Sequence, residues 1–124
     1  MIDFQNASFL KLRRVGNDFS NEIAPLLLSN EQVIETYRGI RDGVVFTNLR
    51  LIVINVQGLT GKKKDFTSLP YSKIQAFSVE TAGVLDLDSE LEIWFAGMGK
   101  IKLEFTGQTN IKAISNMIGQ FVFR

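Results

Sequence analysis

The chain of 124 residues contains neither cysteine nor histidine. Without cysteine there can be no disulfide framework, no thiolate nucleophile and no thiolate zinc site. Without histidine the chain cannot build a serine–histidine or cysteine–histidine hydrolase, a histidine metal cage or the usual proton shuttle of neutral pH. Catalysis would have to rest on carboxylates, lysine, tyrosine or serine, and no constellation of these stands out. We therefore expect no enzyme activity, no metal and no cofactor.

A charge excess and long hydrophobic runs are absent as well. Fourteen Lys and Arg against thirteen Asp and Glu give a net charge of +1, so no general field attracts nucleic acid or an acidic bilayer. The longest apolar runs, residues 25–28 and 51–54, are far shorter than the roughly 18 to 20 residues of a membrane span. Near the start, apolar residues precede Lys11, Arg13 and Arg14, the reverse of a signal peptide. We expect a cytoplasmic protein that does not bind nucleic acid.

What the chain does contain is a hydrophobic pattern typical of a β-rich domain. Short runs rich in Val, Ile, Thr and aromatic residues are separated by glycines, which predicts a meander of hairpins. The predicted strands are residues 32–38, 43–47, 50–57, 63–69, 74–81, 91–96 and 100–106. The last two alternate most clearly, and their apolar positions are the predicted core: Leu91, Ile93, Phe95, Ile101, Leu103 and Phe105.

Two segments have helical periodicity. Residues 17–29 predict an N-terminal helical segment, capped by Asn17 or Asp18 and interrupted by Pro25. After Gly107, an apolar stripe over residues 111–121 predicts a C-terminal amphipathic helix, with Thr109 or Asn110 as its cap.

A seven-stranded antiparallel barrel that is partly open leaves one end for such a helix to close. The predicted fold class is therefore mainly β, a barrel with a capping α-helix. We treat residues 17–124 as a single domain. Phe4, Phe9 and Leu12 in residues 1–16 hint at packing, but the pattern leaves the order of that N-terminal segment open.

Several ordered motifs resemble those of a known family. They are "APLLL" of residues 24–28, "RDGVVFTNLRLIVINVQGLTGKK" of 41–63, "SLPYSKIQAFSVETAG" of 68–83, "LDLDSELEIW" of 85–94 and the closing helix. With these motifs the chain, from about Ile23 onward, resembles the bacterial pleckstrin-homology (PH) domain family, long catalogued as a domain of unknown function.

The resemblance implies a PH-like barrel capped by a helix and no enzyme activity. It further implies that the chain is its own partner in a cyclic homo-oligomeric ring, with a pentamer expected for the short, single-domain form. The ring would bind an unknown protein partner through a polar surface built where neighbouring strands meet.

Five basic residues are candidate anion contacts: Arg38, Arg41, Lys62, Lys63 and Lys64. A P-loop is excluded, because its first glycine and its Ser or Thr would fall on Val56 and Lys63. The segment 37–43 also lacks the alternating Lys and Arg of a phosphoinositide-binding PH domain and contains Asp42. The lysines have two interpretations: they solvate the tip of a hairpin, or they bind an anionic lipid or a phosphorylated ligand.

Three carboxylates, Asp86, Asp88 and Glu90, occupy alternate positions that a calcium or magnesium site would also use. An EF-hand loop would need glycine where Leu91 stands. The interleaved leucines favour an ordinary strand entry with one wet face.

The remaining candidates are interface residues: Trp94, Glu92, Ile52, Ile54 and Tyr71. By alternation Trp94 and Glu92 point away from the core, and Trp is enriched among interface anchors. Alternatively, the first helix or the N-terminal segment covers Trp94.

Strand 50–57 is apolar on both faces, although a small barrel has only one inside. Either the first helix or another subunit must shield the second face, which carries Ile52 and Ile54. Tyr71, which follows Pro70 at a turn, either donates a hydrogen bond at such an interface or caps the rim of the barrel.

Overall fold

The computed structural model describes residues 1–124. Its elements are β1 (Ser8–Val15), α1 (Ser20–Ile23), the 3-10 turn η1 (Ala24–Leu26), β2 (Val33–Arg38), β3 (Gly43–Thr47), β4 (Arg50–Gln57), β5 (Lys63–Pro70), the 3-10 turn η2 (Tyr71–Lys73), β6 (Ile74–Glu80), β7 (Ser89–Phe95), β8 (Gly99–Phe105) and α2 (Ile111–Val122). All seven predicted strands are present within two residues of their expected bounds.

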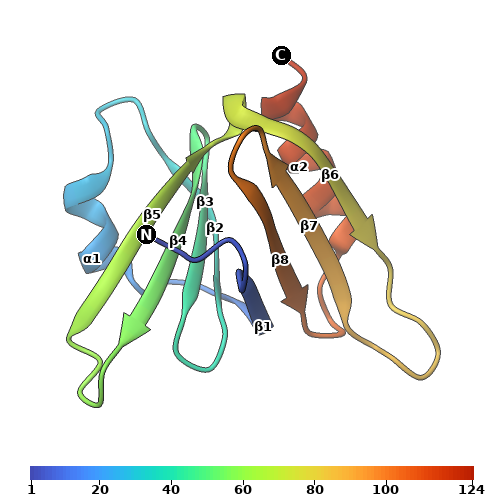
Figure 1. Ribbon diagram of the computed structural model, residues 1–124, viewed down its shortest axis with the longest axis horizontal. Helices are drawn as coiled ribbons and strands as arrows, with labels where there is room; N and C mark the ends of the chain where they lie inside the picture. The colour runs from blue at the N-terminus through green and yellow to red at the C-terminus, as the bar shows by residue number, and fades with distance from the viewer.

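The strands form one sheet in the order β5-β4-β3-β2-β1-β8-β7-β6. Two halves of this sheet diverge from the η2 turn, with α1 beside the β5–β4 half and α2 beside the β6–β7 half (Figure 1). β5 and β6 are the two edges and pair on one side only. The partly open barrel with its closing helix is thereby confirmed.

Strand β1 is the element that the sequence pattern missed, so the sheet has eight strands and not seven. It pairs antiparallel with β2 through residues 13–15 and parallel with β8 through Ser8, Phe9 and Leu12, so the sheet is not purely antiparallel. Lys11 adopts a positive φ of 56° where the register shifts. This bulge puts Phe9 and Leu12 in the same core at a spacing of three, which breaks the alternation expected of a strand.

The main core lies between the two halves of the sheet and α2. All six predicted core residues of β7 and β8 are buried there, along with Leu51 and Val53 of β4 and Ile111, Ile114 and Ile118 of α2. The residues before β1 also contribute to this core. Ile2 is buried, and Phe4 packs edge-on against Phe95, 6.5 Å between ring centroids. Gly99, at φ 143°, leaves room for Phe4, since a Cβ there would lie 3.0 Å from it.

The two helical segments follow the expected periodicity with one correction. Pro25 ends the first helix after one turn, so that only residues 20–26 of the predicted segment are helical, as α1 and the 3-10 turn η1. The N-cap of α1 is Phe19, not Asn17 or Asp18, because Asp18 instead pairs with Arg38. At α2 the predicted cap is confirmed: the Asn110 Oδ1 accepts a hydrogen bond from the Ala113 N–H at 3.1 Å.

Candidate functional site

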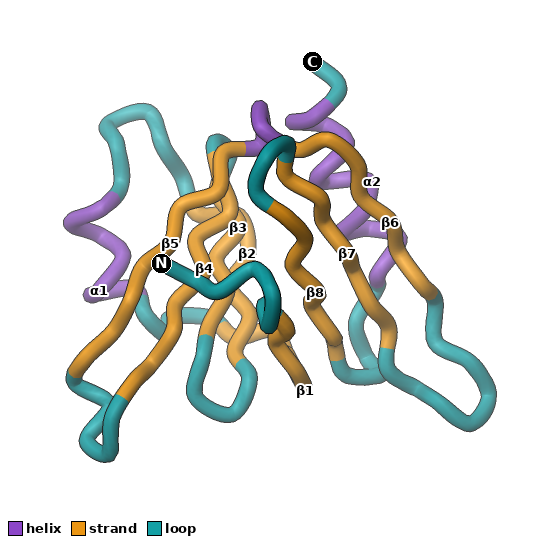
Figure 2. The backbone as a smooth tube through the Cα atoms, in the orientation of Figure 1, coloured by secondary structure: helices purple, strands orange, loops and turns teal.

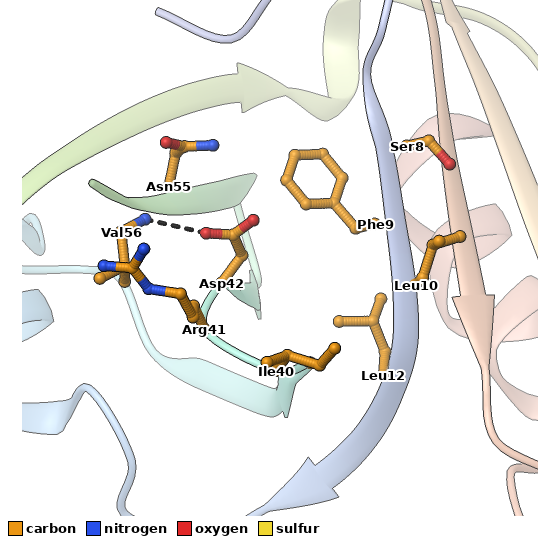
Figure 3. A pocket seen from close by; sticks show the side chains of 10 residues that line it. Ser8, Phe9, Leu10, Leu12, Ile40, Arg41, Asp42, Asn55 and Val56 are labelled. Carbon is orange, nitrogen blue, oxygen red and sulfur yellow. Dashed lines mark hydrogen bonds between the residues drawn. The ribbon is translucent and has the colours of Figure 1, made fainter. Parts of the chain in front are cut away.

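The loops at one end of the barrel surround two neighbouring hollows. Figure 2 shows the β2–β3 and β4–β5 loops near each other at this end, with the β6–β7 loop at the opposite side of the same end. The first hollow, of about 390 Å³, lies between β1, the β2–β3 turn and the end of β4. Phe9 and Leu12 line it from one side, and Ile40, Arg41 and Asp42 from the other (Figure 3).

Within this first hollow the charged groups are already engaged. The Asp42 Oδ1 accepts a hydrogen bond from the backbone N–H of Val56 at 2.9 Å, which ties the β2–β3 turn to β4 (Figure 3). Arg41 donates from Nη2 to the carbonyl of Gly58 and so bridges the β2–β3 and β4–β5 turns. Arg41 lines both hollows, together with Ile40 and Val56.

The second hollow, also of about 390 Å³, is the more basic one. Arg38, Arg41 and Lys64 line it, with Glu22 as its one acidic group. Arg38 is partly neutralised, because its Nη1 lies 2.7 Å from the Asp18 carboxylate and its guanidinium covers the ring of Phe19 at 5.3 Å.

The structure thus brings together three of the five predicted anion contacts. Lys62 and Lys63 remain exposed at the β4–β5 hairpin and do not line the hollow. The three lysines thus lie at the hairpin, as predicted from the sequence. Lys63 and Lys64 are the first two residues of β5.

The outer face of β7 and β8 carries a ladder of ion pairs with a tryptophan at one end. Glu92 pairs with Lys100 and Glu90 with Lys102, each at 3.1 Å. The hydrogen bond that Lys102 donates to Glu90 raises the pKa of Lys102. Trp94 is 45% exposed, and the Lys100 ammonium lies 5.1 Å from its ring centroid. Neither α1 nor the N-terminal segment covers this tryptophan.

The three alternating carboxylates belong to this network of ion pairs. Asp88 lies 2.6 Å from Lys11 and, chiefly through that hydrogen bond, raises the pKa of Lys11. Glu90 is paired with Lys102, and Asp86 accepts a hydrogen bond from the backbone N–H of Asp88. Their contacts are those of a charged strand entry.

Three of the predicted interface residues are buried inside the chain, which corrects their assignment. Ile52 and Ile54 lie under Phe19 and Ile23, so the first helical segment shields the second face of β4 and no other subunit is needed there. Tyr71 is also buried; its hydroxyl donates to the Thr47 carbonyl at 2.7 Å, and its ring stacks on Phe121. Tyr71 therefore caps the rim, the second of its two interpretations, and burial raises its pKa.

Sequence reasoning missed a buried ion pair that holds the opposite end of the barrel. Arg50 donates to the Glu31 carboxylate from Nε at 2.8 Å and from Nη2 at 2.7 Å, and the Thr47 hydroxyl donates to it at 2.6 Å. These hydrogen bonds lower the pKa of Glu31 to about 2, and those from Arg50 have the largest effect. Nothing in the pattern signals this pair, because its partners lie nineteen residues apart.

Comparison with known proteins agrees with this geometry. The profile of the bacterial PH domain family matches residues 3–122, almost the whole chain. The chain belongs to the bacterial PH domain family. The match includes the N-terminal segment that forms β1. No helix of this family member is long and apolar enough to cross a bilayer.

Relatives and solved structures support the assignment. The chain is 50% identical over 92 residues to YjqA of Bacillus subtilis (strain 168), described as uncharacterized, covering 74% of this chain and 70% of YjqA. A DUF1696 family protein with a pleckstrin-homology domain from Shewanella loihica PV-4 superimposes with a TM-score of 0.80 at 40% identity, covering 90% of this chain and 97% of the other. A pleckstrin homology domain from Shewanella amazonensis SB2B superimposes with a TM-score of 0.66 at 38% identity, covering 86% of this chain and 86% of the other.

Proposed function

We propose that this PH domain is a non-enzymatic interaction module that assembles with copies of itself into a closed ring, a pentamer in its expected form, and presents a polar surface to a protein partner. The observation that carries the proposal is the pair of free edges of its sheet. β5 pairs only with β4, and β6 only with β7. Such edges have unpaired backbone donors and acceptors and invite pairing with another strand.

The two edges are complementary in strand direction and in charge. β5 runs towards η2 and β6 runs away from it, so a neighbour with the same orientation brings its β5 alongside β6 in the antiparallel sense (Figure 1). Lys63 and Lys64 begin β5, and Glu80 ends β6 at the same end of the barrel. Opposite charges therefore meet across the contact. A contact of this head-to-tail kind, repeated by rotation, generates a ring.

The polar surface of the proposal is the ion-pair ladder of β7 and β8. Glu90, Glu92, Lys100 and Lys102 face outward, and each acid already has a base beside it. Trp94 stands opposite Ala76 of the edge strand, whose small side chain leaves the indole open towards a neighbour at that edge. In the ring, the ladder would be repeated once per subunit, which favours a partner that binds several sites at once.

Sedimentation-velocity ultracentrifugation over a hundredfold range of concentration tests the assembly. A closed ring gives one sharp species, five times the 14.0 kDa of the chain in the pentameric form. A series of growing species indicates an open chain of subunits, and a 14.0 kDa species at every concentration overturns the proposal.

A second candidate function, binding of an anionic lipid or a phosphorylated ligand, is favoured by one specific observation. Arg41 from the β2–β3 loop and Lys64 from the start of β5 converge on the second hollow, and no acidic side chain pairs with either. Glu22 in the same hollow and the Asp18 partner of Arg38 act against an anion.

Cosedimentation with vesicles that contain anionic lipid separates this candidate from the first. Binding that falls steeply between about 50 and 300 mM salt, and that the charge-removing change Lys64→Gln weakens, supports it. Absence of binding at low salt removes it and leaves the ring proposal untouched.

A further inference from the structure

The longest loop of the structure, between β6 and β7, displays apolar side chains that nothing in the chain covers. Val84 and Leu85 are 93% and 98% exposed, and Leu87 is also exposed. Three exposed aliphatic residues within four positions are unusual on a monomer and mark a contact site. We infer that this loop docks into the hollows between the β2–β3 and β4–β5 loops of a second copy of the chain. The inference rests on the proposed ring and specifies its joint.

The loop is held in shape at its base. The Gly83 N–H donates to the Asp86 carbonyl at 2.6 Å, which closes a turn around Val84 and Leu85. At the base, Asp88 pairs with Lys11, and the Leu87 carbonyl lies so close to Gly107 that a Cβ there would be 2.8 Å from it. A loop fixed in this way loses little conformational entropy when it binds.

The receiving surface has the complementary chemistry. Ile40 and Leu59 stand almost fully exposed on the two loops that border the second hollow, and Arg41 and Lys64 line the same hollow. The docking loop offers the same combination with opposite charge, because Leu85 is followed directly by Asp86. Apolar contact between Leu85 and the two exposed aliphatic residues would bring Asp86 to the basic wall.

The positions of the two surfaces exclude a contact within one chain. The β4–β5 and β6–β7 loops lie at opposite corners of the same end of the molecule (Figure 1). A neighbour whose β5 edge meets this chain's β6 edge has its β4–β5 hairpin at that same end, beside the β6–β7 loop. The loop contact and the edge contact therefore belong to one head-to-tail joint.

Disulfide trapping tests the joint without background, because the chain has no cysteine. The double variant Leu59→Cys with Leu85→Cys would place one thiol on each surface of every copy. Both positions are exposed, so neither change should impair folding. Under mild oxidation we expect a ladder of covalent species up to the full ring on a non-reducing gel, whereas either single variant gives dimers at most.

The outcomes separate this inference from the proposed function. If the wild type forms a ring but the double variant cross-links no further than the single variants, the loop docking is wrong and the ring stands on other contacts. If the wild type is a monomer and nothing cross-links, both are wrong.

Charge reversal provides an independent check on the same pair of surfaces. Asp86→Lys and Lys64→Glu should each weaken assembly roughly tenfold in the dissociation concentration, because each places like charges across the joint. The two changes combined in one chain restore opposite charges at every joint and should recover most of the assembly. Equal assembly in all four proteins would overturn the inference. Lys112→Glu, on the exposed face of α2, is the matched control.

Discussion

At the scale of single residues, the carboxylate of Glu31 holds three segments together. It accepts hydrogen bonds from the Leu28 N–H, the Thr47 hydroxyl and the Arg50 guanidinium. Its side chain has no exposed surface, so removal of one partner would leave a buried charge unpaired. Glu31 lies outside every helix and strand. It thus attaches the loop that precedes β2 to strand β4.

The lowered pKa of Glu31 predicts an acid-dependent loss of stability. In the folded protein the pKa is about 2, against 4.5 for a free carboxyl group. A depressed pKa means that the stabilisation is complete above about pH 4.5 and is lost as the pH falls towards 2, by up to about 3 kcal/mol. Urea unfolding at pH 7 and pH 3 should show this loss in the wild type.

The variant Glu31→Gln should be less stable than the wild type at pH 7 and should depend less on pH over this window. The matched control is Glu22→Gln, because Glu22 is exposed and hydrogen-bonds to none of these partners. An unchanged pH dependence in Glu31→Gln would contradict the account.

Gly43 gives a second residue-scale prediction. A Cβ at this position of β3 would lie 2.3 Å from the Phe19 ring, which covers the second face of the sheet. Gly43→Ala should therefore displace that ring and destabilise the fold by about 1 to 3 kcal/mol. Gly16→Ala, with no atom within 4 Å of the added Cβ, should change the thermal midpoint little. Equal midpoints for the two variants would show that Phe19 is not held against β3.

At the scale of elements, hydrophobic periodicity was sufficient to predict every strand or helix that has one regular buried face. β7 and β8 were predictable because Leu91, Ile93 and Phe95 alternate with the outward-facing Glu92 and Trp94, and α2 because its stripe recurs at helical spacing. β1 was not predictable, since the bulge at Lys11 shifts its period and its parallel partner β8 lies about 90 residues away in the chain. Long-range pairing of this kind leaves no local signal.

The cap of α2 supports a prediction at this scale. Replacement of Asn110 by Ala removes the acceptor for the Ala113 N–H and should cost about 1 kcal/mol in the free energy of unfolding. The exposed Lys112→Ala, two residues further along the chain, is the control and should be nearly neutral. Chemical denaturation of both variants measures this difference. A loss of unfolding free energy well below about 0.5 kcal/mol for Asn110→Ala would show that the cap does not stabilise the helix.

At the scale of the whole molecule, the candidate site was only partly predictable. The outward position of Trp94 and Glu92 followed from strand alternation, and the structure agrees. The burial of Ile52, Ile54 and Tyr71 depended instead on where α1 and α2 pack, which period alone does not specify. The convergence of Arg41 and Lys64 likewise required knowing that the β2–β3 loop lies beside the start of β5.

The proposed ring also depends on whether the free edges of the sheet pair with those of other copies. A sheet closed within one chain has no such edges, whereas this sheet ends in β5 and β6 with an exposed tryptophan one strand inside the β6 edge. Assembly into a ring would pair these edges and shelter the exposed leucines of the β6–β7 loop at the same time.

The most direct test is the mass in solution, by size-exclusion chromatography with light scattering, for the wild type, Trp94→Ala and the control Met98→Ala. Met98 has a similar exposure to Trp94 but stands on the β7–β8 turn. The account predicts a closed multimer, about 70 kDa for five chains of 14.0 kDa, that Trp94→Ala disrupts and Met98→Ala preserves. A wild type that elutes as a 14.0 kDa monomer would contradict the ring. A multimer that Trp94→Ala leaves intact would remove Trp94 from its joint.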